Sequence, residues 1–186
     1  MARLSIMPDI VPAINQAWLL NANSRGRINA VIEAVRGPRV LDVGCGWGFV
    51  AATLAAAGLA VDATDTNEAL REVILAYGLP NLRWTPWPPV GGDYDTVLFL
   101  EVWEHVADML ERIALLELCR NAMSQAGRFL FSVPTPGRWT PNAEHVNLPV
   151  SSRAYLDELG AAGFSVMSHE PVGNGYWNLV IAKGAP

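Results

Sequence analysis

The sequence contains only two cysteines, Cys45 and Cys119, and they lie far apart. Neither forms a CxxC pair or another spacing typical of metal ligands, which argues against a disulfide framework and against a metal site. No apolar run approaches the roughly 18 residues that a membrane-spanning helix needs. The first residues also lack the charged start, apolar run and small-residue cleavage site of a signal peptide. We therefore expect a cytoplasmic protein.

Basic residues are scarce as well, with 13 lysines and arginines against 18 acidic residues and a net charge of −5. Nucleic-acid binding takes most of its affinity from neutralising phosphates, and no stripe of lysine or arginine exists here to do so. Hydrophobic residues make up 51% of the chain and charged residues 17%, which excludes an intrinsically disordered protein. The sequence thus predicts a single folded domain with neither nucleic acid nor a membrane as its partner.

Short β-rich runs alternate with helical stretches from residue 39 onward. Alternation of this kind predicts an α/β fold with a parallel sheet and helices on both faces. Two final strands, at residues 164–169 and 176–183, are joined too tightly for a crossover helix, so we expect an antiparallel hairpin at the sheet edge. Residues 8–35 predict one or two amphipathic helices, broken near Asn23 and Ser24. The other expected strands are 39–43, 59–64, 81–84, 94–100 and 128–133, and the other expected helices are 48–57, 67–77, 104–123 and 152–162.

The most specific feature is VLDVGCGWG at residues 40–48, where a buried strand leads into three glycines at alternate positions. Glycine allows a sharp backbone turn and lets a ligand lie against amides at a helix N-terminus. A dinucleotide fingerprint has the spacing GxGxxG. Here Asp42 precedes the glycines in the spacing DxGxGxG. A carboxylate at this point suits a cationic or hydrogen-bond-donating ligand better than a diphosphate.

A second carboxylate, Asp65, follows the next expected strand. At the tip of such a strand a carboxylate can accept hydrogen bonds from both hydroxyls of a ribose. Asp65 could instead cap the following helix, but Thr66 and Asn67 are equally good caps. The position of Asp65 therefore favours ribose binding.

Five segments together resemble the class I S-adenosylmethionine-dependent methyltransferases. The third of them is similar to a motif of the branch that includes ubiquinone-biosynthesis O-methyltransferases. The resemblance covers about residues 39–170 and implies a single-domain, Rossmann-like fold with a seven-stranded, mostly parallel sheet. It also implies S-adenosylmethionine as cofactor, S-adenosylhomocysteine as product, and no metal. The segments are VLDVGCGWG at 40–48, DATDTNEAL at 62–70, YDTVLFLEVWEHVAD at 94–108, AGRFLFSVP at 126–134, and EHV at 144–146 with AGF at 162–164.

One segment departs from the family pattern. The third strand of the family leads to an acidic residue that binds adenine, whereas here it runs into RWTPWP at residues 83–88, without a carboxylate and with a shortened loop. We expect Trp84 or Trp87 to hold the adenine by stacking, while backbone amides contact its edge.

The resemblance implies a set of cofactor contacts. Glu101 is expected near the methionine end, and Cys45 is expected to offer a small side chain and a backbone amide. Arg25 and Arg27 could hold the methionine carboxylate, although a charged outer helix face explains them about as well. The expected contacts are Asp42, Gly44, Cys45, Gly46, Gly48, Asp65, Thr66, Trp84, Trp87, Leu100, Glu101 and Arg25.

Methyl transfer needs a general base only where the acceptor must lose a proton. His105 is the main candidate because its unperturbed pKa lies near operating pH, and a structural imidazole is an equally good explanation. Glu104 is a second candidate, or a favourable charge in the first turn of the helix expected at 104–123. His145, oriented by Glu144, could reach the acceptor, with a solvated loop pair as the alternative.

The chain lacks a long insertion that would form a substrate-capping domain. A lid would come from the helical segment at residues 1–38, from residues 135–149, or from a second subunit in a homodimer, with residues 39–186 as the cofactor-binding domain. The expected function is methyl transfer to an oxygen or nitrogen of a small-molecule acceptor. Two alternatives stay open at this point, namely a non-catalytic S-adenosylmethionine-binding scaffold or regulatory subunit and, less favoured, a nicotinamide-dependent oxidoreductase.

Overall fold

Seven strands form one sheet in the order β3-β2-β1-β4-β5-β7-β6 in the computed structural model, which describes residues 22–89, 92–139 and 145–185. Strands β1 to β5 pair in parallel, while β7 runs antiparallel to both β5 and β6. The predicted parallel sheet with an antiparallel hairpin at its edge is confirmed. The strands are β1 (Arg39–Val43), β2 (Ala60–Thr64), β3 (Leu82–Trp84), β4 (Tyr94–Leu100), β5 (Met123–Pro134), β6 (Phe164–Val172) and β7 (Trp177–Gly184).

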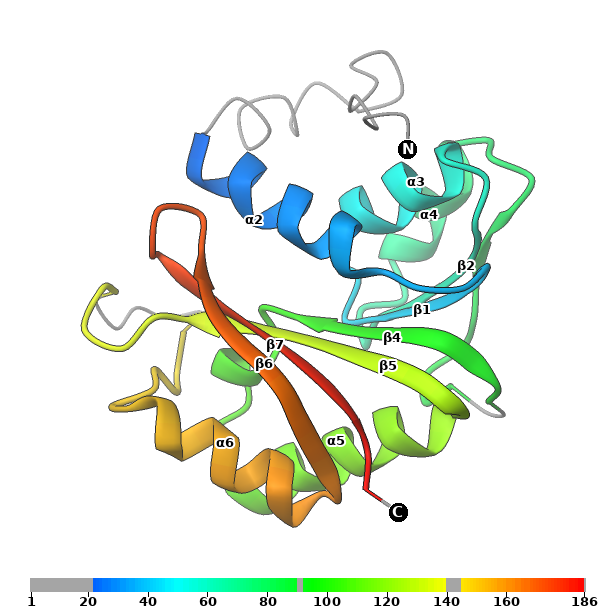
Figure 1. The fold of residues 1–186 in the computed structure, drawn as a ribbon. Coiled ribbons are helices and arrows are strands. Elements are labelled where there is room, and N and C mark those ends of the chain that lie inside the picture. The colour runs from blue at the N-terminus through cyan, green and yellow to red at the C-terminus, as the bar shows by residue number, and fades with distance from the viewer. Residues whose placement is uncertain (1–21, 90–91, 140–144, 186) are drawn as a thin grey trace.

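Helices cover both faces of this sheet (Figure 1). On one face lie α2 (Ala22–Ala34), α3 (Phe49–Ala56) and α4 (Leu70–Ala76). On the other lie α5 (Met109–Ala122) and α6 (Ser152–Ala161). Because both faces are covered, the central strands are almost wholly apolar and buried, as the sequence of β4, YDTVLFL, shows.

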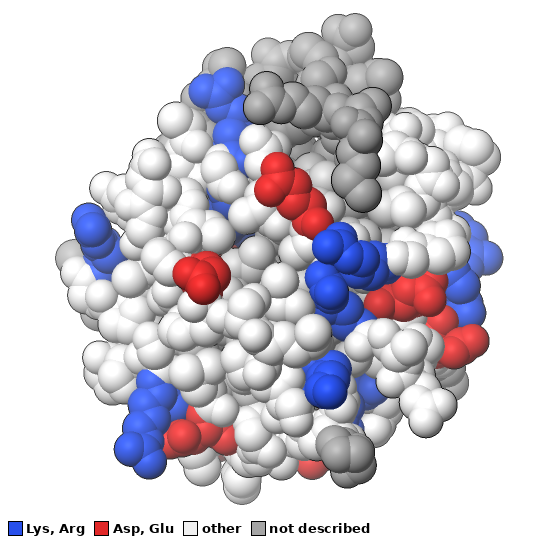
Figure 2. Space-filling view, viewed as in Figure 1, with Lys and Arg blue, Asp and Glu red and all other residues white. Residues whose placement is uncertain are grey.

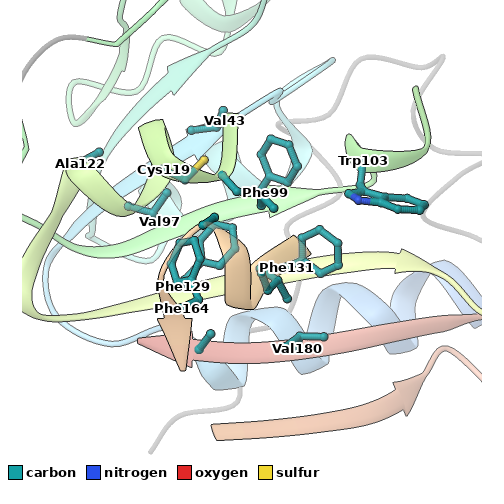
Figure 3. Packing of buried hydrophobic residues seen from close by; sticks show 14 of the residues in the cluster. Val43, Val97, Phe99, Trp103, Cys119, Ala122, Phe129, Phe131, Phe164 and Val180 are labelled. Carbon is teal, nitrogen blue, oxygen red and sulfur yellow. The ribbon is translucent and has the colours of Figure 1, made fainter. Parts of the chain in front are cut away.

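Two hydrophobic cores result, one on each side of the sheet. The core beneath α5 and α6 is rich in aromatic side chains, and Phe129 stacks on Phe164 with ring centroids 4.4 Å apart. Phe131 and Phe99 continue this layer toward Trp103, as Figure 3 shows. The opposite core, beneath α2, α3 and α4, contains smaller residues of alanine, valine and leucine type. The aromatic layer thus ends close to the segment that follows β4.

The helix expected at 104–123 is wrong at its beginning. After β4 the chain forms a loop with one short 3₁₀ turn, η2 (Trp103–His105), and α5 begins only at Met109. The Asp108 side chain caps α5 by accepting a hydrogen bond from the Glu111 amide at 2.9 Å. Glu104 and His105 therefore lie in a loop in front of the helix and not in its first turn.

The connection from β3 to β4 differs from the other parallel connections. The chain passes through a helix between β1 and β2, between β2 and β3, and between β4 and β5. Residues 85–89 and 92–93, which are the described part of the β3–β4 connection, contain no helix. The described part of this connection therefore adds no helix to either face of the sheet.

Helix α2 begins at Ala22, where the described residues begin, so the break expected near Asn23 and Ser24 stays a prediction. Its buried side, which includes Ile28 and Val31, joins the core next to α3. The earlier residues of the expected N-terminal segment lie outside the described residues. None of the described helices is long and apolar enough to cross a membrane. On the face seen in Figure 2, basic and acidic side chains lie next to one another.

Candidate functional site

The glycine segment forms a tight turn between β1 and α3, and hydrogen bonds hold it to the end of β2. The amides of Gly44 and Cys45 donate to the Thr64 carbonyl at 2.9 and 3.0 Å. Gly44 has a positive φ, and a side chain there would collide with Val102. Gly46 also has a positive φ but faces open space. The turn therefore leaves room for a ligand at Gly46, while the Cys45 amide is already used within the fold.

Asp65 lies at the tip of β2 and contacts this turn directly. Its carboxylate accepts hydrogen bonds of 3.0 Å from the amides of Gly46 and Asn67. Two amide donors fix the orientation of the carboxylate, and further lone pairs remain to accept hydroxyl groups. The structure thus places a fixed hydrogen-bond acceptor beside the open part of the glycine turn.

Asp42 lies beneath the turn and is only 3% exposed. Burial raises the pKa of this carboxyl to about 7, and the nearby negative charge of Asp65 acts in the same direction. The positive charge of Arg27 and a hydrogen bond from the Ala51 amide lower the pKa in part. Asp42 therefore lies beneath the glycine turn as a buried supporting residue. It does not line the pocket described next.

A pocket of about 570 Å³ opens at the carboxyl ends of β1, β2 and β4. This is the edge of an open α/β sheet at which ligands bind. Six of the predicted cofactor residues line it together with His105, namely Gly44, Gly46, Asp65, Thr66, Trp87 and Glu101. Its remaining lining residues are Val43, Phe99, Val102, Val106, Glu111 and Leu115.

Glu101 begins the loop after β4 with a φ of 57°, in the left-handed region that non-glycine residues seldom adopt. Its amide donates to the Ser132 carbonyl at 3.0 Å, and the Ser132 hydroxyl donates to Glu101 Oε1 at 2.7 Å. Arg27 Nη1 lies 3.7 Å from the same oxygen. Residues held in such backbone conformations cluster at functional sites.

The two arginines considered for the methionine carboxylate differ in burial. Arg27 is buried, whereas Arg25 is exposed on α2. The structure thus brings Arg27 to the edge of the site and leaves Arg25 away from it.

Three groups with acid–base character meet at the outer end of the loop. Glu104, His105 and His145 each present a ligand atom, and these atoms lie within 4.8 Å of one another. Glu104 is fully buried, and among the described residues neither of its carboxylate oxygens has a hydrogen-bond partner. Burial, and then the nearby charge of Glu101, raise the pKa of Glu104 well above its ordinary value. Such a cluster can transfer a proton, and its donors would also suit a divalent cation. Glu144, the expected partner of His145, lies outside the described residues.

Aromatic rings surround this cluster on the side of β7. The Trp139 ring meets the His145 ring edge-on at 5.5 Å between centroids and lies equally far from Trp177. The Arg27 guanidinium lies over the Trp177 ring, 5.3 Å from its centroid. Aromatic rings therefore lie next to His145 of the cluster and next to Arg27.

Several predicted contacts lie elsewhere in the structure. Leu100 is buried among the residues beneath α3, and Trp84 packs against the same core. Gly48 faces Ile74 and has left-handed backbone geometry at the start of α3. Of the two tryptophans considered for adenine, the structure brings only Trp87 into the pocket.

Several of the lining residues were not predicted from the sequence. Val102 and Val106 come from the loop after β4, and the part of it from residue 104 onward was expected to be helical. Glu111 and Leu115 come from the exposed or half-buried side of α5. The spacing of Asp108 and Glu111, a capping pair, could have located the start of α5 and with it this wall.

The chain was compared with family models and with curated proteins, and both comparisons found methyltransferases. A family model described as a methyltransferase domain matches residues 17–169. The ubiquinone biosynthesis O-methyltransferase of Bordetella parapertussis is 31% identical over 121 residues, which are 60% of this chain and 48% of that protein. The chain thus spans about half the length of the curated relatives it matches.

Two solved structures show the same fold at low sequence identity. The CcbJ methyltransferase from Streptomyces caelestis has a TM-score of 0.72 at 16% identity, and the match covers 87% of this chain and 90% of that one. The glycopeptide N-methyltransferase MtfA, in complex with S-adenosyl-L-methionine, has a TM-score of 0.71 at 16% identity over 86% of each chain.

Proposed function

The chain belongs to a family of methyltransferase domains, and from this premise we propose that it transfers a methyl group from S-adenosylmethionine to an oxygen or nitrogen of a small-molecule acceptor. The observation that carries the proposal is the pocket that joins the glycine turn, Asp65, Glu101 and His105 at one edge of the sheet. The proteins matched above support it, since one is named an O-methyltransferase and another an N-methyltransferase crystallised with that cofactor.

The cofactor fits the donors and acceptors of the pocket. Asp65 is held by two amides and accepts the ribose hydroxyls. The open space at Gly46 lets the ligand approach the backbone. Glu101 receives the methionine ammonium, and Arg27, 3.7 Å from Glu101, receives the methionine carboxylate. When bound, the cofactor supplies an electrophilic methyl group on a sulfonium.

The residues around the cluster then act on the acceptor. In-line displacement needs the acceptor atom and the methyl group aligned in a site that excludes water, which positioning alone can accelerate strongly. His105 lines the pocket and takes the proton of a hydroxyl acceptor, and the buried Glu104 carboxyl, within 4.8 Å of the imidazole, is the neighbouring group to which that proton can pass. The rings of Trp139, Trp177 and His145 favour a flat acceptor.

Calorimetric titration with S-adenosylmethionine, S-adenosylhomocysteine and, as a control, NADH tests the cofactor. We expect micromolar binding of the two sulfur ligands and none of NADH. Incubation with methyl-labelled cofactor and a panel of phenols and amines then tests transfer. Binding without transfer to any acceptor would support a scaffold in place of an enzyme, and binding of NADH alone would support an oxidoreductase.

A further inference from the structure

We infer that Glu111 recognises the exocyclic amino group of the cofactor's adenine, an inference that rests on the proposed function. The carboxylate takes the place of an acceptor that residues 85–89, the part of the β3–β4 connection next to the pocket residue Trp87, do not supply. Residues 85–89 of that connection are Thr-Pro-Trp-Pro-Pro, and none carries a carboxylate.

The order of the elements fixes where the adenine lies. The sheet order places the tip of β2, with Asp65, between the tips of β1 and β3. A ribose on Asp65 with the methionine part toward Glu101 leaves the rest of the pocket for the base. We assign to that part the lining residues Trp87, which follows β3, Val106, and Glu111 and Leu115 of α5. The base therefore lies between the β3–β4 connection and α5.

The absence of a helix from the described part of the β3–β4 connection explains why residues of α5 can contact the base. In the described part of the β3–β4 connection no helix covers the near side of α5. The pocket thus extends to Glu111 and Leu115, one helical turn apart on the same side of α5. Trp87 and Val106 offer apolar surfaces for the faces of the base, and Glu111 offers the only carboxylate among the lining residues assigned to this end.

The chemistry of Glu111 fits an amino group. The pocket has three carboxylates, and two of them already have partners. Asp65 accepts two amides and Glu101 accepts the Ser132 hydroxyl. No described residue donates a hydrogen bond to the Glu111 carboxylate, and its amide is satisfied by Asp108. An ionised carboxylate is an acceptor only, so it favours a 6-amino purine and disfavours a 6-oxo purine.

The test exchanges one hydrogen-bonding group on the protein and one on the ligand. S-adenosylhomocysteine and its 6-oxo analogue, S-inosylhomocysteine, are titrated by calorimetry into the wild type, Glu111→Gln and Glu117→Gln. Glu117 is the matched control, because it is an exposed glutamate of α5 outside the pocket. Glutamine can cap a helix as glutamate does, so the substitution spares the start of α5.

We expect the wild type and Glu117→Gln to prefer the 6-amino ligand by roughly tenfold or more, the scale of a hydrogen bond to a charged group. In Glu111→Gln the preference should fall about tenfold, because the side-chain amide can donate to a 6-oxo group. A gain in affinity for the inosyl ligand also shows that the variant is folded. An unchanged preference in Glu111→Gln would overturn the role of Glu111 alone. Failure of the wild type to bind S-adenosylhomocysteine would overturn the proposed function and this inference with it.

Discussion

The indole nitrogen of Trp103 donates a 2.6 Å hydrogen bond to Glu158 Oε2, and so joins the loop after β4 to α6. Glu158 also accepts hydrogen bonds from Arg112 on α5, the shortest of them at 2.6 Å from Nη2. Arg112 Nη1 in turn donates to the carbonyls of Val106 and Ala107. This buried network therefore holds the loop that carries Glu104 and His105.

Glu158→Gln should destabilise the protein by about 3–5 kcal/mol, because it leaves the buried Arg112 charge without its counter-charge. Urea denaturation at pH 7 measures this free energy of unfolding. Asp157→Asn is the control on the same helix, since Asp157 pairs with Arg153 at 3.1 Å in an exposed position. That change should cost less than about 1 kcal/mol. Equal effects of the two substitutions would show that the buried network does not stabilise the fold.

Asp65→Ala should weaken binding of S-adenosylhomocysteine by about 2–3 kcal/mol, because the ribose hydroxyls lose a charged acceptor. Calorimetric titration measures the change. Glu68→Ala is the control, because Glu68 is an exposed carboxylate three residues after Asp65. Asp65→Asn separates binding from folding, since its amide oxygen can still accept one of the two backbone amides. Unchanged affinity in Asp65→Ala would remove the ribose role.

Arg27→Met should weaken S-adenosylhomocysteine binding about tenfold or more and leave binding of 5′-methylthioadenosine almost unchanged. 5′-Methylthioadenosine has no amino-acid part, so its affinity does not depend on a residue that binds the methionine carboxylate. Arg25→Met, two residues earlier on α2 and exposed, is the matched control and should change neither affinity. Equal losses with both ligands would indicate that Arg27 supports the fold and does not contact the carboxylate.

His105→Ala should lower the rate of methyl transfer to a hydroxyl acceptor by about 10²–10⁴-fold with cofactor affinity retained, as expected for a general base. The rate is measured under saturating cofactor across pH. Transfer at the wild-type rate would assign His105 a structural role.

Removal of metal distinguishes the two uses of the cluster formed by Glu104, His105 and His145. We expect transfer to be unaffected by dialysis against EDTA, because the proposed reaction needs only a proton acceptor. A loss of rate that a divalent cation restores would instead show that the cluster acts through a metal.

Asp42 should make the stability of the ligand-free protein depend on pH. Its pKa is raised to about 7 in the folded state, so the folded state holds a proton that the unfolded state releases near pH 4. Stability from this group is complete below about pH 4 and is lost as pH rises to about 7, at about 1.4 kcal/mol per unit. Chemical denaturation of the wild type and Asp42→Asn at several pH values measures the difference. The stability of the wild type relative to the variant should fall over this range, and parallel profiles would contradict the shifted pKa.

The positions of the strands along the chain were predictable because apolar runs, glycines and short connections are local features. The antiparallel pairing of β7 followed from the few residues that join it to β6. The start of α5 was not predictable from apolar periodicity, because the left-handed backbone at Glu101 and the burial of Trp103 depend on contacts with β5 and α6.

In the site, too, residues defined by local sequence were predictable, and residues placed by tertiary contacts were not. The glycine turn and Asp65 were located correctly because each directly follows a recognisable strand. Arg27 and Arg25 could not be separated by sequence, since only the packing of α2 decides which of them faces Glu101. Leu100 and Glu101 are neighbours in sequence, but Leu100 is buried in the core beneath α3 and only Glu101 lines the pocket.

The position of β7 has a consequence for synthesis on the ribosome. This strand follows the other six in sequence, yet it lies between β5 and β6 and pairs with both along its length. A nascent chain that has produced β6 therefore has no neighbouring strand in place for it. The outer part of the sheet, including the Trp177 ring beside Arg27, can form only after residues 177–184 have left the exit tunnel.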